Sequence, residues 1–377
     1  MDQRTFQARV AHTRDRLLRP LDLDMLLCYA DDISAAGAVR YLTDFDVYAM
    51  YALAIVPRRG DVALAFGLHH SAYLVRVKQS ATADYLSGTY APGALCRQLL
   101  QDAGTDRAPR VGIVGGANMF RRIAGDLHKA LDGATYVEID QEAWHKAIAP
   151  LGEPLVRDAL DRSAAIARDA VAAVADDLAP TRSAADLAAI AALTARRRGA
   201  DLMNREIVEI RASAGPVLAD RLGPPGRNPI GAGGGIAVEI ALRYRGLRAY
   251  CGRTFGLDEA WSTDLDRAAA LHQRVIALAK PGRTGGEFAR DAARLYAEAG
   301  ATGAGDFGFG HGVGFQDREP PVLRAGSEDE LQPGTALVIR SRIGSAACGA
   351  VFLADTVMMG EHGPTVLTAA QSTIASQ

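Results

Sequence analysis

Lysine is scarce in this chain of 377 residues and occurs only at positions 78, 129, 146 and 280, so arginine supplies most of the basic side chains. Acidic and basic residues nearly balance, which gives a formal net charge of −2. A chain without a surplus of positive charge has no general attraction for nucleic acid or for an anionic membrane surface. We therefore expect neither nucleic acid nor a membrane among its partners.

Cysteine and long apolar runs are also lacking. Four cysteines, Cys28, Cys96, Cys251 and Cys348, are scattered without CxxC spacing, which argues against a zinc ribbon or a disulfide framework. The polar N-terminal segment has no apolar core of a secretion signal, and no segment approaches the roughly 20 uninterrupted apolar residues of a membrane span. These absences predict a cytoplasmic protein.

The first part of the chain alternates between helical and strand patterns. Apolar strand-like runs occupy 25–30, 51–57, 61–67 and 110–116, and helical spacing occurs at 3–18, 69–78 and 91–103. Such alternation predicts an α/β domain with a largely buried sheet over residues 1–150. The Pro- and Gly-containing segment 149–154 interrupts both patterns and marks the start of a second domain, 151–377.

The second part contains a faint internal repeat. Residues 178–188 and 279–289 each place a Pro-containing turn before Ser183 or Thr284, with an acidic residue three positions later and an apolar run after it. This is the capping-box pattern of a helix start. Paired strand signals follow each copy, at 235–244 with 247–255 and at 336–343 with 349–359. We expect a pseudo-symmetric α+β domain with a central cleft lined by its sheet.

Five ordered stretches carry a resemblance to a known superfamily. They are VRYLTDF (39–45), VEIALRYRGLRAYCGRTF (238–255), FGHGVGFQDREPP (309–321), ELQPGTALVIRSRI (330–343) and GAVFLADTVMMGEHGPTVLT (349–368). In order and spacing they resemble the creatinase/prolidase/methionine-aminopeptidase superfamily. The resemblance implies an α/β N-terminal domain followed by the pseudo-symmetric "pita-bread" domain.

Peptidases of this superfamily hold two divalent metals with two Asp, one His and two Glu. The matching positions here are Glu239, Tyr250, His311, Arg340 and Ala354. Tyrosine is a poor substitute ligand, alanine supplies none, and a guanidinium would repel a cation only a few ångströms away. The resemblance therefore implies a dismantled metal site, and we expect a divergent member that uses no metal and no other cofactor.

Arginines replace polar family residues at three positions that would face the cleft. Arg340 replaces a Glu, Arg318 stands where a His is common, and Arg227 or its neighbour Asn228 matches another family His. Arginine presents a fork of donors suited to a carboxylate or phosphate. We therefore predict an anionic or zwitterionic small molecule as substrate.

Creatinase and ectoine hydrolase are similar precedents for hydrolysis without metal on this fold. The substrate-holding Glu positions of creatinase match Gly252 and Arg340 here, so activity on creatine is not expected. In such enzymes an N-terminal segment of the partner subunit reaches the active site. The matching stretch implies a homodimer in which Asp46, Tyr48 and Tyr51 contribute to the partner's site.

Each candidate residue has a functional and a structural interpretation. His311, between two glycines, is either a proton shuttle or a relic that satisfies hydrogen bonds. Glu239 is a general base, the anchor of an ammonium group, or the partner of Arg253 or Arg340 in a structural ion pair. Tyr250 orients the substrate or fills the vacated metal volume. Arg340, Arg318 and Arg227 bind the ligand or, for the two loop arginines, are solvated.

These residues give one leading hypothesis and two alternatives. The first is a metal-independent enzyme that hydrolyses a C–N bond or performs a related lyase or cyclisation step, with His311 and Glu239 as the catalytic pair. The second is an inactive relative that binds a small molecule or a protein through the old cleft, which a cleft filled by Tyr250 and internally paired arginines would favour. The third is a hydrolase that retains a single metal. Strand alternation places Cys251 opposite Tyr250, so we expect a core cysteine there.

Overall fold

A computed structural model describes residues 1–31, 37–45, 47, 50–67, 71–148, 153–201, 208–215, 217–218, 221–301, 308–316, 318–345 and 348–370. The chain forms two compact units, Met1–Ala149 and Pro150–Gln377. None of the helices within these described ranges is long and apolar enough to cross a membrane.

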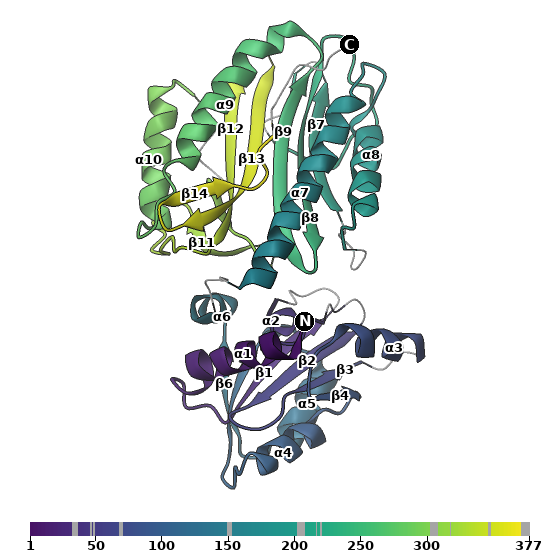
Figure 1. Ribbon diagram of the computed structural model, residues 1–377, viewed down its shortest axis with the longest axis vertical. Helices are drawn as coiled ribbons and strands as arrows, with labels where there is room; N and C mark the ends of the chain where they lie inside the picture. The colour runs from purple at the N-terminus through teal and green to yellow at the C-terminus, as the bar shows by residue number, and fades with distance from the viewer. Residues whose placement is uncertain are drawn as a thin grey trace. The chain divides into compact units, whose positions relative to one another are not determined.

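The N-terminal unit is an α/β domain (Figure 1). Its elements are α1 Gln3–Thr13, the π-helical turn Arg14–Leu18, β1 Met25–Asp31, α2 Gly37–Thr43, β2 Tyr51–Pro57, β3 Ala63–Phe66, α3 Ser71–Ser80, β4 Tyr85–Gly88, α4 Gly93–Asp102, β5 Arg110–Val114, the 3-10 turn Gly116–Asn118, α5 Arg121–Ala130, β6 Thr135–Ile139 and α6 Gln141–Ile148. The described strands form a sheet in the order β4-β3-β2-β1-β5-β6, mixed parallel and antiparallel. β1, β2 and β3 are buried along their whole length, as their unbroken apolar runs predict.

The C-terminal unit is built on one antiparallel sheet. Its elements are α7 Pro154–Asp176, α8 Ala184–Arg197, β7 Val208–Gly215, β8 Gly235–Tyr244, β9 Leu247–Gly256, the 3-10 turn Glu259–Trp261, α9 Ser262–Ile276, α10 Gly285–Glu298, β10 Gly310–Gly312, β11 Glu319–Leu323, β12 Ala336–Ser345, β13 Gly349–Gly360 and β14 Gly363–Val366. Among the described strands the order is β11-β10-β12-β13-β9-β8-β7, and β14 pairs with β13. The two long hairpins, β8–β9 and β12–β13, therefore meet at the centre of the sheet, where β9 pairs with β13.

The two halves of this unit repeat the same local structure. Ser183 and Thr284 each begin a helix with a complete capping box, in which the hydroxyl accepts from a backbone N–H and the acidic side chain accepts in return. Each cap residue also forms an isolated β-bridge, Ser183 to Pro229 and Thr284 to Glu330. The repeat expected from the sequence is thus present in the backbone pairing as well as in the caps.

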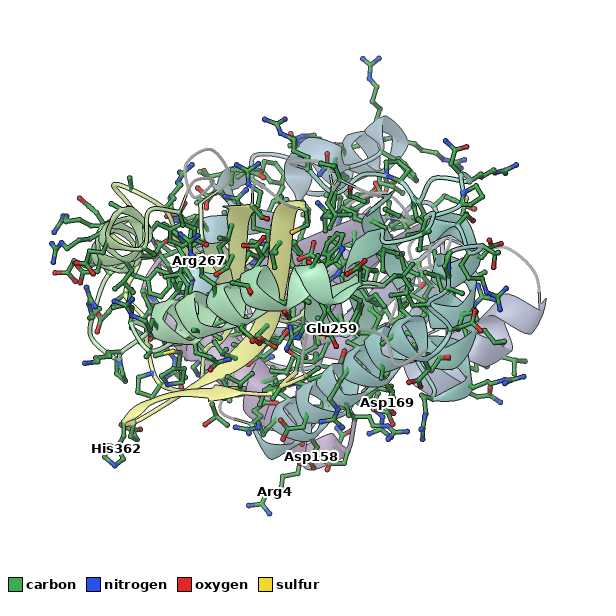
Figure 2. All side chains as sticks on the ribbon, turned by 90° about the horizontal axis from the view of Figure 1, so that it is seen from above. Arg4, Asp158, Asp169, Glu259, Arg267 and His362 are labelled. Atoms are coloured by element: carbon green, nitrogen blue, oxygen red, sulfur yellow. The ribbon has the colours of Figure 1, made fainter. Side chains whose placement is uncertain are left out.

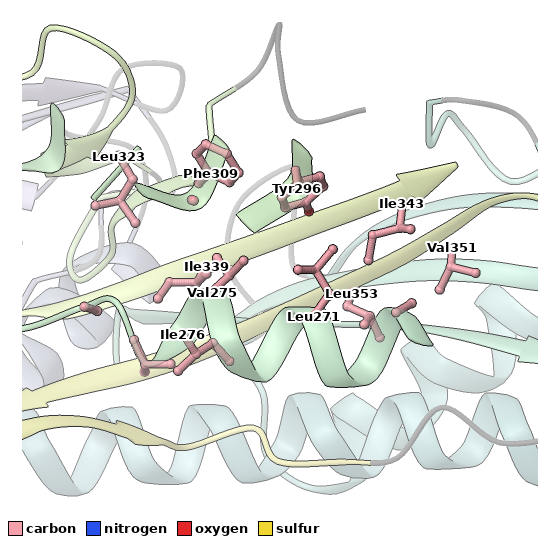
Figure 3. Packing of buried hydrophobic residues seen from close by; sticks show 14 of the residues in the cluster. Leu271, Val275, Ile276, Tyr296, Phe309, Leu323, Ile339, Ile343, Val351 and Leu353 are labelled. Carbon is pink, nitrogen blue, oxygen red and sulfur yellow. The ribbon is translucent and has the colours of Figure 1, made fainter. Parts of the chain in front are cut away.

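Helices cover the sheet through apolar side chains. Figure 3 shows one cluster, in which residues of α9 and α10 pack against β12 and β13; its labelled members are Leu271, Val275, Ile276, Tyr296, Phe309, Leu323, Ile339, Ile343, Val351 and Leu353. A second cluster joins α7 and α8 to β8 and β9. Fully burying an aliphatic side chain of this size contributes roughly 1.5–3 kcal/mol, so these clusters hold the helices on the sheet. Charged residues of α7, such as Asp158 and Asp169, point outward (Figure 2).

Candidate functional site

A single row of paired residues crosses the centre of the C-terminal sheet. Arg340 on β12 lies opposite Ala354 on β13, Ala354 lies opposite Gly252 on β9, and Gly252 lies opposite Glu239 on β8. Directly paired residues project from the same face of a sheet, and three strand spacings separate the backbones of Arg340 and Glu239 by roughly 14 Å. Only Ala354 and Gly252 lie between, so two long side chains can meet above them.

Arg340 and Glu239 form a buried ion pair across this row. The Nε of Arg340 donates to Oε1 of Glu239 over 2.5 Å, and the exposed fractions of the two side chains are 21% and 4%. Burial by itself would lower the pKa of Arg340, but the charge of Glu239 and the hydrogen bond to it raise that pKa above its ordinary value. Arg340 is therefore a fixed cation whose side chain is about one-fifth exposed.

His311 completes the cluster from the neighbouring strand. It lies on β10 opposite Val338, two residues from Arg340 along β12. Its Nδ1 lies 2.9 Å from the carbonyl of Gly312 and its Nε2 lies 3.1 Å from Nη1 of Arg340. A carbonyl only accepts and a guanidinium only donates, so these partners assign the proton to Nδ1 and the lone pair to Nε2.

The environment of His311 keeps its imidazole neutral. Burial is the main cause, the charge of Arg340 is the next, and Arg318 and Arg248 add smaller effects; together they lower its pKa to about 3. The flanking glycines are required by packing, because a Cβ at Gly310 would collide with the carbonyl of Val338. A proton-shuttle role consequently requires the substrate to take the place of Arg340 at Nε2.

Tyr250 forms the floor beneath Arg340. The guanidinium carbon of Arg340 lies 4.7 Å from the centre of the Tyr250 ring, and that of Arg248 lies 5.3 Å from it. The ring of His311 meets Tyr250 edge-on at 5.9 Å. Tyr250 is only 3% exposed. Its ring stabilises two neighbouring cations through cation–π contact and fills the space between them.

This arrangement does not fit a pair of divalent metals. Of the five residues that match family metal ligands, only Glu239 and His311 have side chains that commonly bind metal. The guanidinium of Arg340 hydrogen-bonds both of them. Ala354 and Gly252 supply no ligand. In the part of the chain that the structure describes, no cluster of three or more His, Cys, Asp or Glu side chains is placed to hold a metal ion. By the sequence resemblance, Arg340 matches a Glu that binds metal in the family peptidases.

The structure thus brings together four of the predicted site residues, Glu239, Tyr250, His311 and Arg340. Arg318 is exposed on the loop before β11, near enough to lower the pKa of His311. Arg227 is exposed on the loop whose backbone pairs with the start of α8, and among the described residues no hydrogen bond or ion pair joins it to these four. The ligand-binding roles of both loop arginines stay predictions.

The expected contributions across a dimer concern Asp46, Tyr48 and Tyr51. Asp46 and Tyr48 lie outside the described residues. Tyr51 is fully buried in the N-terminal unit, where its ring stacks on Tyr29 and its hydroxyl donates to the carbonyl of Thr89. The expectation for Tyr51 was therefore wrong: an unbroken buried strand makes it a core residue.

Two further arginines near the site were not predicted. Arg248 lies on the same face of β9 as Tyr250. Its position two residues before Tyr250 in the strand could have indicated this, because residues i and i+2 share one face. Arg211 lies directly opposite Glu239 on β7. No strand was predicted there, although residues 208–214 alternate apolar and polar side chains, and that alternation was the available signal.

The structural ion pair left open for Glu239 is with Arg340 and not with Arg253. Arg253 donates instead to Asp355 over 2.7 Å, on the other face of the sheet. Cys251 shares that face and is fully buried, and burial raises the pKa of its thiol to about 12. Such a thiol is unreactive, so Cys251 is a core residue as expected.

Comparisons with known proteins agree with this architecture. The model of metallopeptidase family M24 matches residues 158–361. The Xaa-Pro dipeptidase structure from Bacillus anthracis superposes with a TM-score of 0.79 at 17% identity, covering 98% of this chain and 99% of that one. The expected fold class, an α/β domain followed by a pita-bread domain, is confirmed.

Two curated relatives match over shorter stretches. The agropine synthesis cyclase of Rhizobium rhizogenes is 30% identical over 104 residues, which is 28% of this chain and 26% of that protein. The Xaa-Pro dipeptidase of Pyrococcus furiosus is 33% identical over 99 residues, 26% of this chain and 28% of that protein. The matches thus span about a quarter of the length of each relative.

Proposed function

The chain belongs to metallopeptidase family M24, and we propose that within this family it is a metal-independent enzyme acting on a small anionic or zwitterionic metabolite. One observation carries the proposal. The guanidinium of Arg340 lies between Glu239 and His311, held by hydrogen bonds of 2.5 and 3.1 Å, at the position that matches a metal ligand in the family. In this proposal the fixed organic cation takes the place of the metals of a family peptidase.

Arg340 would bind the substrate and stabilise charge that develops during reaction. Its Nε and one Nη1 hydrogen serve Glu239 and His311, and a further N–H of the fork would donate to a substrate carboxylate. Hydrolysis of a C–N bond and cyclisation by attack on a carboxyl carbon both place negative charge on a substrate oxygen. A preoriented cation in a partly dry site stabilises that charge.

Glu239 and His311 would handle protons. Glu239 neutralises Arg340 in the resting state, and it can accept a proton from an attacking water, hydroxyl or amine. His311 is neutral at physiological pH because its pKa is about 3, and its single lone pair at Nε2 faces Arg340. A substrate group that inserts between Arg340 and His311 could donate a proton to Nε2 and take it back later in the reaction.

The names of the two curated relatives support keeping both hydrolysis and cyclisation in the proposal. One is a cyclase of agropine synthesis by name, and the other is a dipeptidase, which cleaves a C–N bond. We include a homodimer in the proposal, with Asp46 and Tyr48 reaching the partner's site.

A second candidate is a binding protein without turnover. Arg340 is already paired internally and Tyr250 is buried, the two features expected of a cleft that holds a ligand passively. The two functions differ in whether a bound carboxylate is converted.

The test is a screen of amino acids and their N-acyl, lactam and lactone derivatives. Compounds that raise the melting temperature of the wild type are incubated with it in EDTA and followed by mass spectrometry. We expect conversion of at least one compound, lost in Arg340→Lys, which keeps the charge without the fork, and in His311→Ala. Arg196→Ala, at an exposed arginine in the last turn of α8, is the control and should behave as wild type.

Each outcome decides between the candidates. Binding without conversion supports the binding protein. Conversion that EDTA abolishes and Mn²⁺ restores contradicts metal independence. Conversion unchanged in His311→Ala removes that residue from the mechanism.

A further inference from the structure

A buried polar chain lies directly behind Arg340, on the opposite face of the sheet. Ser341 follows Arg340 on β12, and its hydroxyl lies 2.7 Å from Nδ1 of His272 on α9. Nε2 of His272 lies 3.1 Å from Oδ2 of Asp355 on β13. Although burial raises the pKa of Asp355, His272 and Arg253 lower it below its ordinary value. An ionised carboxylate only accepts, so Nε2–H of His272 donates to Asp355, and Nδ1 is left to pair with the hydroxyl of Ser341.

From Asp355 the chain of hydrogen bonds continues to Tyr250. Oδ1 of Asp355 accepts from the hydroxyl of Thr368 over 2.8 Å, and that hydroxyl accepts from the backbone N–H of Thr356 over 2.9 Å. The hydroxyl of Thr356 donates to the carbonyl of Tyr250 over 2.9 Å and accepts from the N–H of Tyr250 over 2.8 Å. One end of the chain is thus beside Arg340 and the other is at Tyr250.

The order serine, histidine, aspartate is that of a hydrolytic triad, but no substrate reaches it here. Ser341, His272 and Asp355 are between 1% and 2% exposed. A buried network whose members are all satisfied acts by rigidity, since each lost bond leaves an unpaired polar group in the core.

We infer that His272 and Ser341 are positioning residues for Arg340, because the Ser341–His272–Asp355 contacts fix β12 against α9 and β13 directly behind it. Arg340 reaches across two strands to make a 2.5 Å contact with Glu239, so a small rotation of β12 at residues 340–341 would break that contact. The inference rests on the proposed function only in taking Arg340 as the ligand anchor.

The test compares two buried serines of the same unit. Ser341→Ala removes the hydroxyl that bonds His272. Ser163→Ala, the control, removes an equally buried hydroxyl that donates to the carbonyl of Leu242 over 3.3 Å, away from this chain. Ser341→Thr retains a hydroxyl, and Ser341→Cys, a nearly isosteric weak donor, is used where Ser341→Ala does not fold.

The readout is the Nε–H nuclear magnetic resonance signal of Arg340, assigned by its loss in Arg340→Lys, without ligand and during titration with acetate. We expect Ser341→Ala to move the ligand-free signal and to weaken acetate binding roughly threefold to tenfold, the range for one buried hydrogen bond. Ser341→Thr should restore both, and Ser163→Ala should change neither.

An unchanged ligand-free signal in Ser341→Ala overturns the inference, as does an equal change in Ser163→Ala. Failure of acetate to move the wild-type signal contradicts the anion-binding role of Arg340 instead, because the ligand-free comparison does not depend on that role.

Discussion

Removing Arg340 should destabilise the C-terminal unit far more than removing its partner Glu239. In Arg340→Met the carboxylate of Glu239, only 4% exposed, loses the guanidinium with which it forms its ion pair and hydrogen bond. Leaving one member of a buried ion pair uncompensated costs about 3–5 kcal/mol. In Glu239→Gln the guanidinium keeps its contacts with His311 and with the ring of Tyr250, and its side chain is more exposed than that of Glu239, so we expect a loss of about 1–3 kcal/mol.

The double variant Arg340→Met with Glu239→Gln sharpens the prediction. The neutral amide of Glu239→Gln carries no buried charge that Arg340 must compensate. The double variant should therefore be more stable than Arg340→Met alone by about 1–2 kcal/mol in free energy of unfolding. Non-additivity of this sign is expected only when the two side chains interact directly.

Unfolding of the C-terminal unit can be followed separately. The chain has two tryptophans, Trp144 in the N-terminal unit and the buried Trp261 in the C-terminal one. Urea unfolding is monitored by Trp261 fluorescence in a Trp144→Phe background. Equal losses in the two single variants, with simple additivity in the double variant, would refute the ion pair as the organising contact of the site.

Two other variants probe the same cluster. The pKa of His311 is about 3 in the folded chain and about 6.5 in the unfolded chain. As pH falls below about 6.5 the unfolded chain therefore takes up a proton that the folded chain does not, and the stability that the neutral His311 contributes above pH 6.5 is lost. Between pH 7 and pH 5 the wild type should lose about 2 kcal/mol more stability than His311→Gln by the Trp261 assay, and parallel pH profiles would contradict the assignment. Gly252→Ala places a Cβ 2.9 Å from that of Ala354 and 2.8 Å from the ring of Phe352, so it should cost about 1–3 kcal/mol and move the Arg340 Nε–H signal. Gly226→Ala, where a Cβ meets nothing within 4 Å, is the control, and equal effects at both glycines would reject the requirement for space between Arg340 and Glu239.

The sequence predicted the strands and caps because their signals are local. Alternating or continuous apolar runs gave β2, β8, β9, β12 and β13, and the Ser183 and Thr284 caps gave two helix starts. β7 and β10 were not predicted. β7 has a local apolar–polar alternation that could have indicated it, whereas the three-residue β10 is defined by its pairing with β11 and β12.

The membership of the site was predictable, but its contacts were not. Motif spacing indicated Glu239, Tyr250, His311 and Arg340, whereas the choice of Arg340 over Arg253 as partner of Glu239 depends on which sheet face each occupies. The role of Gly252 and Ala354 as open space follows only from the register of four strands. The hydrogen-bonded network behind Arg340 joins His272 of α9 to Asp355 of β13, more than 80 residues apart in sequence, so no local pattern could predict it.

Calorimetric titration of the wild type with Mn²⁺ tests most directly whether Arg340 has taken the place of the metals. With the guanidinium bonded to both Glu239 and His311, we predict no saturable binding at micromolar concentrations. Saturable uptake of one or two Mn²⁺ ions, lost in both Glu239→Gln and His311→Gln, would contradict the account.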